Sequence, residues 1–202
     1  MITTSSRIGT RGVRCTDHPF REAILTDERV AESLQKAHVV LDVGAGECSL
    51  LDLLRDLSVR VDTYIAVDVC PDTRDFKRNP SVFSINRVRA RAESLPIRSD
   101  SVDVCLSINV TPYFDDVGRA LSEMSRATKP GGMMILVCPV QSPYWLRFAG
   151  GRELELTKLD SSLFDEIGKV LTRKQVVIDL GNSVNLEIAE MVIVERLPNH
   201  QR

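Results

Sequence analysis

Apolar residues along the chain follow two alternating patterns. Short apolar runs that end in polar residues or glycine predict buried parallel strands. These runs are His38–Val43, Tyr64–Asp68, Val82–Ile85, Val102–Ile108 and Met133–Cys138. Between them, apolar residues recur at helical spacing. The helices predicted in this way are His18–Ala37, with Asp27 as a candidate N-cap, Ser49–Asp56, Asp115–Thr128 and Ser162–Leu171.

The end of the chain changes to two strands in succession. Gln175–Leu180 and Leu186–Glu195 are predicted strands, joined by a hairpin-like turn at Gly181–Ser183. Alternating strands and helices predict a parallel sheet covered on both faces. The predicted fold class is α/β, a doubly wound, mostly parallel seven-stranded sheet with a C-terminal antiparallel hairpin. Residues 1–17 are expected to form a flexible N-terminal segment, and residues 18–202 a single domain.

Composition narrows the expected partners. The chain has 26 Lys and Arg against 28 Asp and Glu, a net charge of -2, so no basic field favours nucleic acid. No apolar run is long enough to span a bilayer, and the first residues lack a secretory pattern. We therefore expect a cytoplasmic protein that binds neither nucleic acid nor membrane. The five cysteines form no CxxC pair, so neither disulfides nor a metal site are expected.

The strongest chemical signal is the glycine turn that follows the first predicted strand. Asp42-Val43-Gly44-Ala45-Gly46 lies between a strand and a helix, where ligands bind in an open α/β sheet. Asp68 ends the next strand, and a carboxylate there can accept hydrogen bonds from both hydroxyls of a ribose. Either feature alone is also typical of an ordinary connection, but together they favour an adenosine-containing ligand.

The charges in this turn bear on which ligand that is. A dinucleotide fingerprint has a third glycine where this chain has Ser49, and Glu47 would repel a pyrophosphate. A cationic sulfonium ligand meets no such repulsion. The turn therefore favours S-adenosylmethionine, and a nicotinamide-dependent oxidoreductase is the less favoured alternative.

Three stretches together resemble the class I S-adenosylmethionine-dependent methyltransferases, in their small-molecule branch. Leu41–Gly46 is similar to their first motif, Ala90–Asp103 to the segment before their fourth strand, and Lys129–Gly132 to the turn before their fifth. The resemblance covers about Val39 to Val137. It implies a Rossmann-like fold, S-adenosyl-L-methionine as cofactor, and methyl transfer to a small-molecule acceptor by in-line displacement.

The same resemblance implies a set of cofactor-binding residues. Those expected at the methionine and ribose part of the cofactor are Asp42, Gly44, Ala45 and Gly46. Asp68 is expected to bind the ribose hydroxyls, and Val69 to pack on the adenine. The residues expected at the adenine edge are Ala92 and Glu93, with Asn109 near the transferred methyl group.

Two residues depart from the family pattern. Cys48 replaces the third glycine of the first motif, and Arg91 stands where many members have an aspartate that recognises adenine. These departures weaken the expected cofactor site. They keep a second hypothesis open, a methyltransferase-like binding or accessory protein without transfer activity.

The acceptor site is less well defined by the sequence. In-line methyl transfer needs alignment and exclusion of water, and a base only if the acceptor loses a proton. The candidate catalytic residues are His18, as a base or merely an exposed cap residue, and Tyr113, as part of the acceptor pocket. No inserted segment covers this side of the predicted domain, which favours a homodimer or a large acceptor.

Overall fold

The computed structural model describes residues 20, 23–24, 26–70, 81–140, 159–179 and 185–198, and these build a seven-stranded sheet. The strands are β1 (Val39–Val43), β2 (Val61–Asp68), β3 (Val82–Arg89), β4 (Val102–Ile108), β5 (Thr128–Pro139), β6 (Lys169–Asp179) and β7 (Asn185–Glu195). Their order across the sheet is β3-β2-β1-β4-β5-β7-β6.

Strand direction confirms the predicted fold class. Strands β1 to β5 pair in parallel, while β7 pairs antiparallel with both β5 and β6. From β1 the chain first builds outward through β2 and β3, then crosses back to β4 on the other side of β1. The strand order therefore reverses between β1 and β4, and in such sheets the crevice beyond these carboxyl ends is the usual ligand site.

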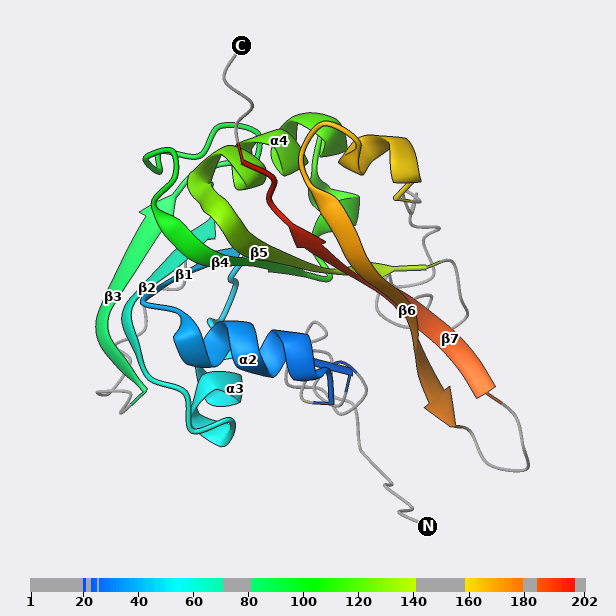
Figure 1. The fold of residues 1–202 in the computed structure, drawn as a ribbon, viewed down its shortest axis with the longest axis horizontal. Coiled ribbons are helices and arrows are strands. Elements are labelled where there is room, and N and C mark those ends of the chain that lie inside the picture. Colours follow the sequence, from blue (N-terminus) through cyan, green and yellow to red (C-terminus); the bar gives the residue numbers. More distant parts are fainter. Residues whose placement is uncertain are drawn as a thin grey trace.

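Helices cover the sheet on both faces (Figure 1). Helices α2 (Glu28–Lys36) and α3 (Leu50–Asp56) lie on one face, and α4 (Val117–Ala127) lies on the other. Two short 3-10 helices, η1 (Thr111–Tyr113) and η2 (Ser161–Phe164), complete the described elements. Each face has its own apolar cluster, one containing Val30, Leu34 and Leu53, and the other containing Ala120, Leu121 and Met124.

Capping residues determine where the two longest helices begin. Asp27 accepts hydrogen bonds from the N–H groups of Arg29 and Val30, at 3.1 and 3.4 Å, which confirms it as the N-cap of α2. The predicted single helix from His18 to Ala37 is wrong in its extent, because Thr26 and Asp27 interrupt it. Asp116 caps α4 through the N–H of Arg119, at 3.0 Å.

The predicted helix Ser162–Leu171 is wrong. Only Ser161–Phe164 forms a helical turn, and β6 begins at Lys169 opposite Glu195 of β7. Gly168 makes this close approach feasible, since a Cβ there would lie 2.6 Å from the carbonyl oxygen of Glu195. Pairing with β7 therefore overrides a local apolar spacing that also fits a helix.

The predicted turn Lys129–Gly132 lies within a strand. Strand β5 runs from Thr128 to Pro139, and its register against β4 shifts after Val102, as expected for a β-bulge. The Gly131 N–H donates to the carbonyl of Arg196, and the Arg196 N–H donates to the carbonyl of Gly132. Gly131 and Gly132, at the start of β5, are thus paired with Arg196, the residue directly after β7. The predicted Gly181–Ser183 turn and the N-terminal segment 1–17 lie outside the described residues.

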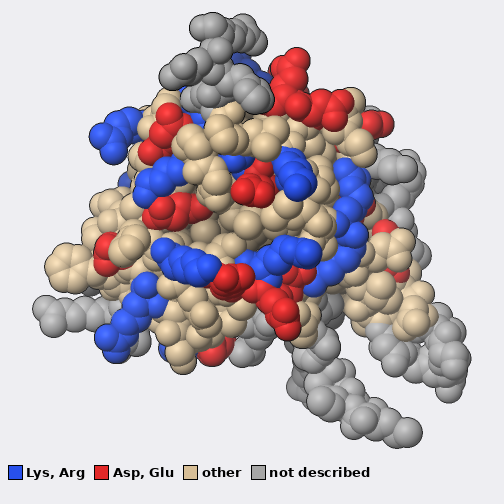
Figure 2. Space-filling view, in the orientation of Figure 1, with Lys and Arg blue, Asp and Glu red and all other residues tan. Residues whose placement is uncertain are grey.

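Surface properties of the described part bear on the expected partners. On the face shown in Figure 2, Lys and Arg side chains are interspersed with Asp and Glu rather than gathered into one basic surface. No described helix is long and apolar enough to cross a membrane. Within the same residues, no group of three or more His, Cys, Asp or Glu side chains could hold a metal ion.

Candidate functional site

The loop after β1 and the residues after β4 meet at the point where the strand order reverses. Gly44 has a φ of +78°, and a Cβ built on it would lie 2.4 Å from both γ-carbons of Val110. Gly46 also has a positive φ, of +47°, but a Cβ there would have no atom within 4 Å. Gly44 is therefore needed for close packing on Val110, whereas Gly46 borders open space.

The carboxylate of Asp68 joins this loop to the end of β2. One oxygen accepts the N–H of Gly46 at 2.9 Å, and the other accepts the N–H of Cys70 at 2.8 Å. The N–H groups of Gly44 and Ala45 donate to the carbonyl of Val67 just before it. A carboxylate has about four acceptor positions, so Asp68 keeps capacity for two hydroxyl donors.

Asp42 lies in the sheet immediately before this loop. Its side chain is buried, with only 5% of the residue exposed, and the hydroxyl of Tyr64 donates a hydrogen bond to it. Burial raises the pKa of the Asp42 carboxyl to about 7, the Tyr64 hydrogen bond lowers it, and the charge of Asp68 raises it. Asp42 therefore changes charge near neutral pH.

The next group of expected site residues follows β3. Ala92 and Glu93 are both buried, and one oxygen of Glu93 accepts the N–H groups of Asp115 and Asp116 at 2.7 and 3.4 Å. Burial opposes ionisation of Glu93, but the N–H groups of Glu93, Asp115 and Asp116, together with Arg91, hold its pKa below the usual value. Its carboxylate is thus occupied in ordering the start of α4.

Arg91 occupies the position of the expected adenine-binding aspartate. Its guanidinium forms an ion pair with Asp115 and lies 3.5 Å from Glu93. The acidic side chain that pairs most closely with Arg91 is therefore Asp115, from the loop before α4.

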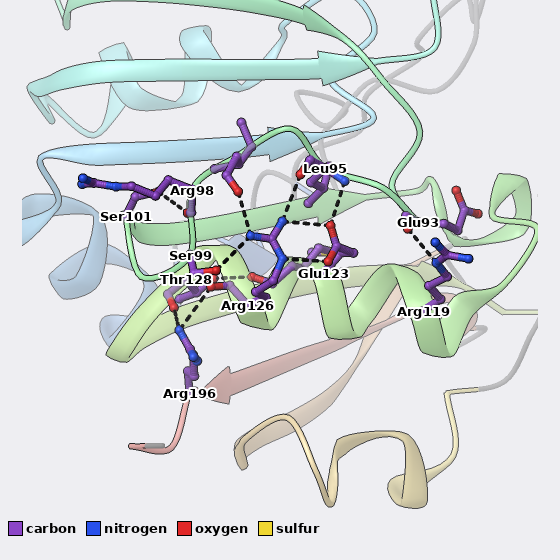
Figure 3. Close-up of polar contacts among 12 residues, drawn as sticks. Glu93, Leu95, Arg98, Ser99, Ser101, Arg119, Glu123, Arg126, Thr128 and Arg196 are labelled. Atoms are coloured by element: carbon purple, nitrogen blue, oxygen red, sulfur yellow. Dashed lines mark hydrogen bonds and ion pairs between the residues drawn. The ribbon is translucent and has the colours of Figure 1, made fainter. Parts of the chain in front are cut away.

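The segment from Ala90 to Ser101 is fastened onto α4 by side chains that the sequence analysis did not single out (Figure 3). Arg126 donates to the carbonyls of Leu95 and Ile97, at 2.9 and 2.8 Å, and Glu123 accepts the N–H of Leu95 at 2.9 Å. Glu123 also pairs with Arg126 at 2.7 Å. The only sequence signal for this network was the opposite charges three residues apart on one helix.

Arg119 adds a further contact from the same helix. Its Nε donates to the carbonyl of Glu93 at 2.9 Å, which fixes the backbone beside Ala92. Arg119, Glu123 and Arg126 thus hold the whole segment between β3 and β4 against one face of α4. This arrangement positions Ala92, which belongs to the apolar cluster on the α4 face, and Glu93, whose carboxylate binds the start of α4.

The end of β4 and the residue after it carry polar groups that have no hydrogen-bond partner in the described part of the chain. Asn109 has a φ of +61°, and both polar atoms of its side-chain amide are buried with no hydrogen-bond partner, as is the hydroxyl of Ser107. A buried polar atom without a partner costs free energy and is rare in native proteins. These atoms indicate a place where a polar ligand group or a bound water is needed.

Of the two candidate catalytic residues, the structure describes only Tyr113. Tyr113 lies in η1 after β4 with 70% of its surface exposed, at the same edge of the sheet as Asn109. His18 lies outside the described residues. Cys48, at the position of the missing glycine, keeps the left-handed backbone, with a φ of +56°, and its side chain is buried in the apolar cluster beneath α3.

Comparison with known proteins identifies the family. Residues 41–136, which include the loop after β1, match the family model of the methyltransferase domain. The chain carries a methyltransferase domain. An uncharacterized methyltransferase of Mycobacterium sp. (strain JLS) is 36% identical over 131 residues, which are 64% of this chain and 48% of that protein. The chain thus spans about half the length of the curated relatives it matches.

Solved structures show the same fold for the methyltransferase domain. A putative methyltransferase of Haloferax volcanii, in complex with the activator Trm112, has a TM-score of 0.66 at 17% identity, covering 93% of each chain. The N-methyltransferase NodS of Bradyrhizobium japonicum has a TM-score of 0.61 at 14% identity, covering 92% of this chain and 100% of NodS.

The residues present fit S-adenosylmethionine, the cofactor of this family. Gly46 faces open space, Asp68 has acceptor capacity at the end of β2, and the unpaired amide of Asn109 is close to the end of β4. A sulfonium and an ammonium group are both cations, and Asp42 and Asp68 supply negative charge at this edge. These features fit an adenosyl sulfonium better than a nicotinamide dinucleotide.

Proposed function

We propose that the protein transfers a methyl group from S-adenosylmethionine to a small-molecule acceptor. The observation that carries the proposal is the junction at the strand reversal, where Asp68 binds the N–H of Gly46 at 2.9 Å and Gly44 packs on Val110. The methyltransferase domain over residues 41–136 supports the reaction class. The small-molecule acceptor rests on the family resemblance and the balanced charge of the chain.

The bound cofactor supplies an electrophilic methyl group on a sulfonium. The chain's own residues then act by binding and orientation. Asp68 would accept the ribose hydroxyls, and the backbone of Gly44–Gly46 would hold the methionine part. The Asn109 amide, buried and unpaired, gains a polar partner at the methyl end, where water must be kept out.

Calorimetry tests this proposal directly. S-adenosylmethionine and its demethylated product should each bind with one site per chain, and a methyl-labelled cofactor should then label at least one member of a panel of small acceptors. Absence of binding of both compounds to the folded protein would refute the proposal. Labelling of nucleic acid or protein instead of any small molecule would refute the acceptor class.

One specific observation favours the alternative of a binding or accessory protein. Arg91 is held by Asp115 and lies beside Glu93, so the adenine edge carries a cation where the family pattern has an aspartate. This alternative predicts no transfer to any acceptor, whether or not the cofactor binds. Single-turnover assays with the labelled cofactor separate it from the enzyme.

We also propose that the protein is a homodimer and is located in the cytoplasm. The exposed Tyr113 and Val69 lie at the ligand-binding edge, where a second subunit would cover apolar surface. Light scattering should give twice the chain mass of 22.5 kDa. A strict monomer would refute the dimer. A different protein partner would then be the next hypothesis to test, such as an activator of the kind bound to the Haloferax volcanii protein.

A further inference from the structure

Asp42 and Tyr64 form a buried polar pair beneath the loop after β1. Asp42 lies opposite Ala66 in the parallel register of β1 and β2, so Tyr64, two residues before Ala66, is on the same face of the sheet. Tyr64 is fully buried, and its hydroxyl donates to the Asp42 carboxylate. Burying an ionised carboxylate is costly unless it is paired or hydrogen-bonded.

The surroundings of the Asp42 carboxyl shift its pKa in opposite directions. Burial raises the pKa of Asp42 to about 7, and Asp68, at the end of β2, acts in the same direction, whereas the Tyr64 hydroxyl favours the charged form. Burial, and next the charge of Asp42, raise the pKa of the Cys105 thiol on β4, so this thiol stays neutral. The charged side chains of the covering helix α3 are exposed: Asp52, Arg55 and Asp56.

Tyr64 is therefore the hydrogen-bond donor that offsets the cost of ionising Asp42. The carboxyl lies two residues before Gly44, and it is electrostatically coupled to Asp68, which binds the loop at Gly46. A negative charge at this depth, shielded from water, attracts a nearby cation far more strongly than an exposed one does. The cofactor brings two cations to this loop.

We propose that Tyr64 is a positioning residue whose buried hydroxyl favours the ionised form of Asp42 beneath the glycine loop, where ionised Asp42 is the counter-charge for the cationic cofactor. This inference rests on the proposed function. It assigns a role to a residue outside the loop, and it couples cofactor binding to the charge state of Asp42.

The coupling has a definite direction. If the cofactor binds only the ionised form, its affinity rises with pH until Asp42 is fully ionised, and at pH 6 it is about tenfold weaker than at pH 8. Replacing Tyr64 with phenylalanine removes the hydrogen bond that favours ionisation. The acid limb of the affinity profile should then move upward by about one to two pH units.

The test compares cofactor affinity from pH 5.5 to 9 in the wild type, Tyr64→Phe and Asp42→Asn. The ligand's own amine titrates near pH 8, an effect that the wild type and Tyr64→Phe share, so the acid limbs of these two proteins are compared directly. The control is His38→Gln. His38 precedes β1 at the opposite end of the strand and pairs with Asp62.

We expect Tyr64→Phe to bind about 5- to 50-fold more weakly than the wild type at pH 7 and within about twofold of it at pH 9. Asp42→Asn should lose the acid limb, and His38→Gln should keep it. A uniform loss of affinity at every pH, or an unchanged profile, would overturn the inference. Failure of the wild type to bind at any pH would instead refute the proposed function.

A second measurement needs no cofactor. The carbon-13 signal of the Asp42 carboxyl should titrate near pH 7 in the wild type and at a higher pH in Tyr64→Phe. This readout stays decisive if the variant binds poorly because its fold is loosened. A midpoint that does not move, or one that moves downward, would overturn the positioning role.

Discussion

The Asp68 carboxylate accepts the backbone N–H of Gly46 at 2.9 Å, which joins the end of β2 to the loop after β1. Because both partners belong to the proposed cofactor site, replacing Asp68 with alanine should loosen the loop and remove the acceptor of the ribose hydroxyls. We expect a loss of affinity of about 10- to 100-fold for both S-adenosylmethionine and its demethylated product, measured by calorimetry. Asp62→Ala, at the exposed start of the same strand, is the control. Equal affinity in the two variants would contradict the role of Asp68.

The contact between Gly44 and Val110 gives a prediction about stability. Gly44→Ala should destabilise the fold by about 2–4 kcal/mol, because the added Cβ would lie 2.4 Å from the Val110 side chain and the backbone φ is +78°. In Gly44→Ala/Val110→Ala, chemical denaturation should show a smaller loss than the sum of the single variants. Gly46→Ala, where nothing lies within 4 Å, should cost only about 1 kcal/mol. Strict additivity would show that the two residues do not touch.

Cys48 provides a test that separates backbone from packing. Its φ is +56°, a conformation that glycine adopts without cost, and its side chain is buried. Cys48→Ala and Cys48→Gly both remove the thiol, but only glycine also relieves the backbone. We expect the glycine variant to be more stable than the alanine variant by about 1 kcal/mol, the reverse of the usual order within regular structure. If alanine were the more stable of the two, the left-handed backbone at this position would be refuted.

Arg126 should control the order of the segment that carries Ala92 and Glu93. Arg126→Ala removes the hydrogen bonds to the carbonyls of Leu95 and Ile97, so the stability should fall by about 2 kcal/mol. Hydrogen exchange at the Leu95 amide should become faster. Arg98→Ala, an exposed arginine of the same segment, is the matched control. Unchanged hydrogen exchange at the Leu95 amide in Arg126→Ala would contradict the role of Arg126 in holding this segment on α4.

The buried carboxyl of Asp42 predicts a dependence of stability on pH. Its pKa of about 7 lies above the value near 4 of an unfolded aspartate, so the native state binds more protons between these values. The free energy of unfolding should therefore fall as pH rises from about 4 to 7 and then level off. Relative to the wild type, Asp42→Asn should gain about 2–3 kcal/mol between pH 5 and pH 8, measured by urea denaturation at both values. A difference that is constant with pH would contradict the raised pKa.

Local patterns in the sequence were sufficient to predict the parallel part of the sheet, strands β1 to β5. The apolar face of α4 and the runs of β1 and β4 each have one consistent interpretation, and the structure confirms them. The segment from Ser162 to Leu171 does not, because its apolar positions fit a helix as well as a strand. Its outcome depends on pairing with β7, a contact that no local pattern reveals.

In the candidate site, too, local sequence patterns predicted some features, whereas others depend on contacts between distant residues. The loop after β1 and Asp68 could be proposed from the sequence because glycines and a carboxylate follow consecutive strands, and the structure places them within hydrogen-bond distance. The packing of Val110 on Gly44, the Tyr64 hydrogen bond and the Arg126 network join residues far apart in the chain. Their residue types are common, so only the folded arrangement reveals these contacts. The roles proposed for the site residues stay predictions until a ligand is bound.

One titration tests the central claim most directly, namely that the loop after β1 and the end of β2 form the cofactor cradle. S-adenosylhomocysteine is added to nitrogen-15-labelled protein while the backbone amide signals are followed. The largest shifts should occur at Gly46 and Cys70, whose N–H groups donate to Asp68. Saturable binding that leaves these two signals unmoved, and shifts only residues of the β6–β7 pair, would contradict the account.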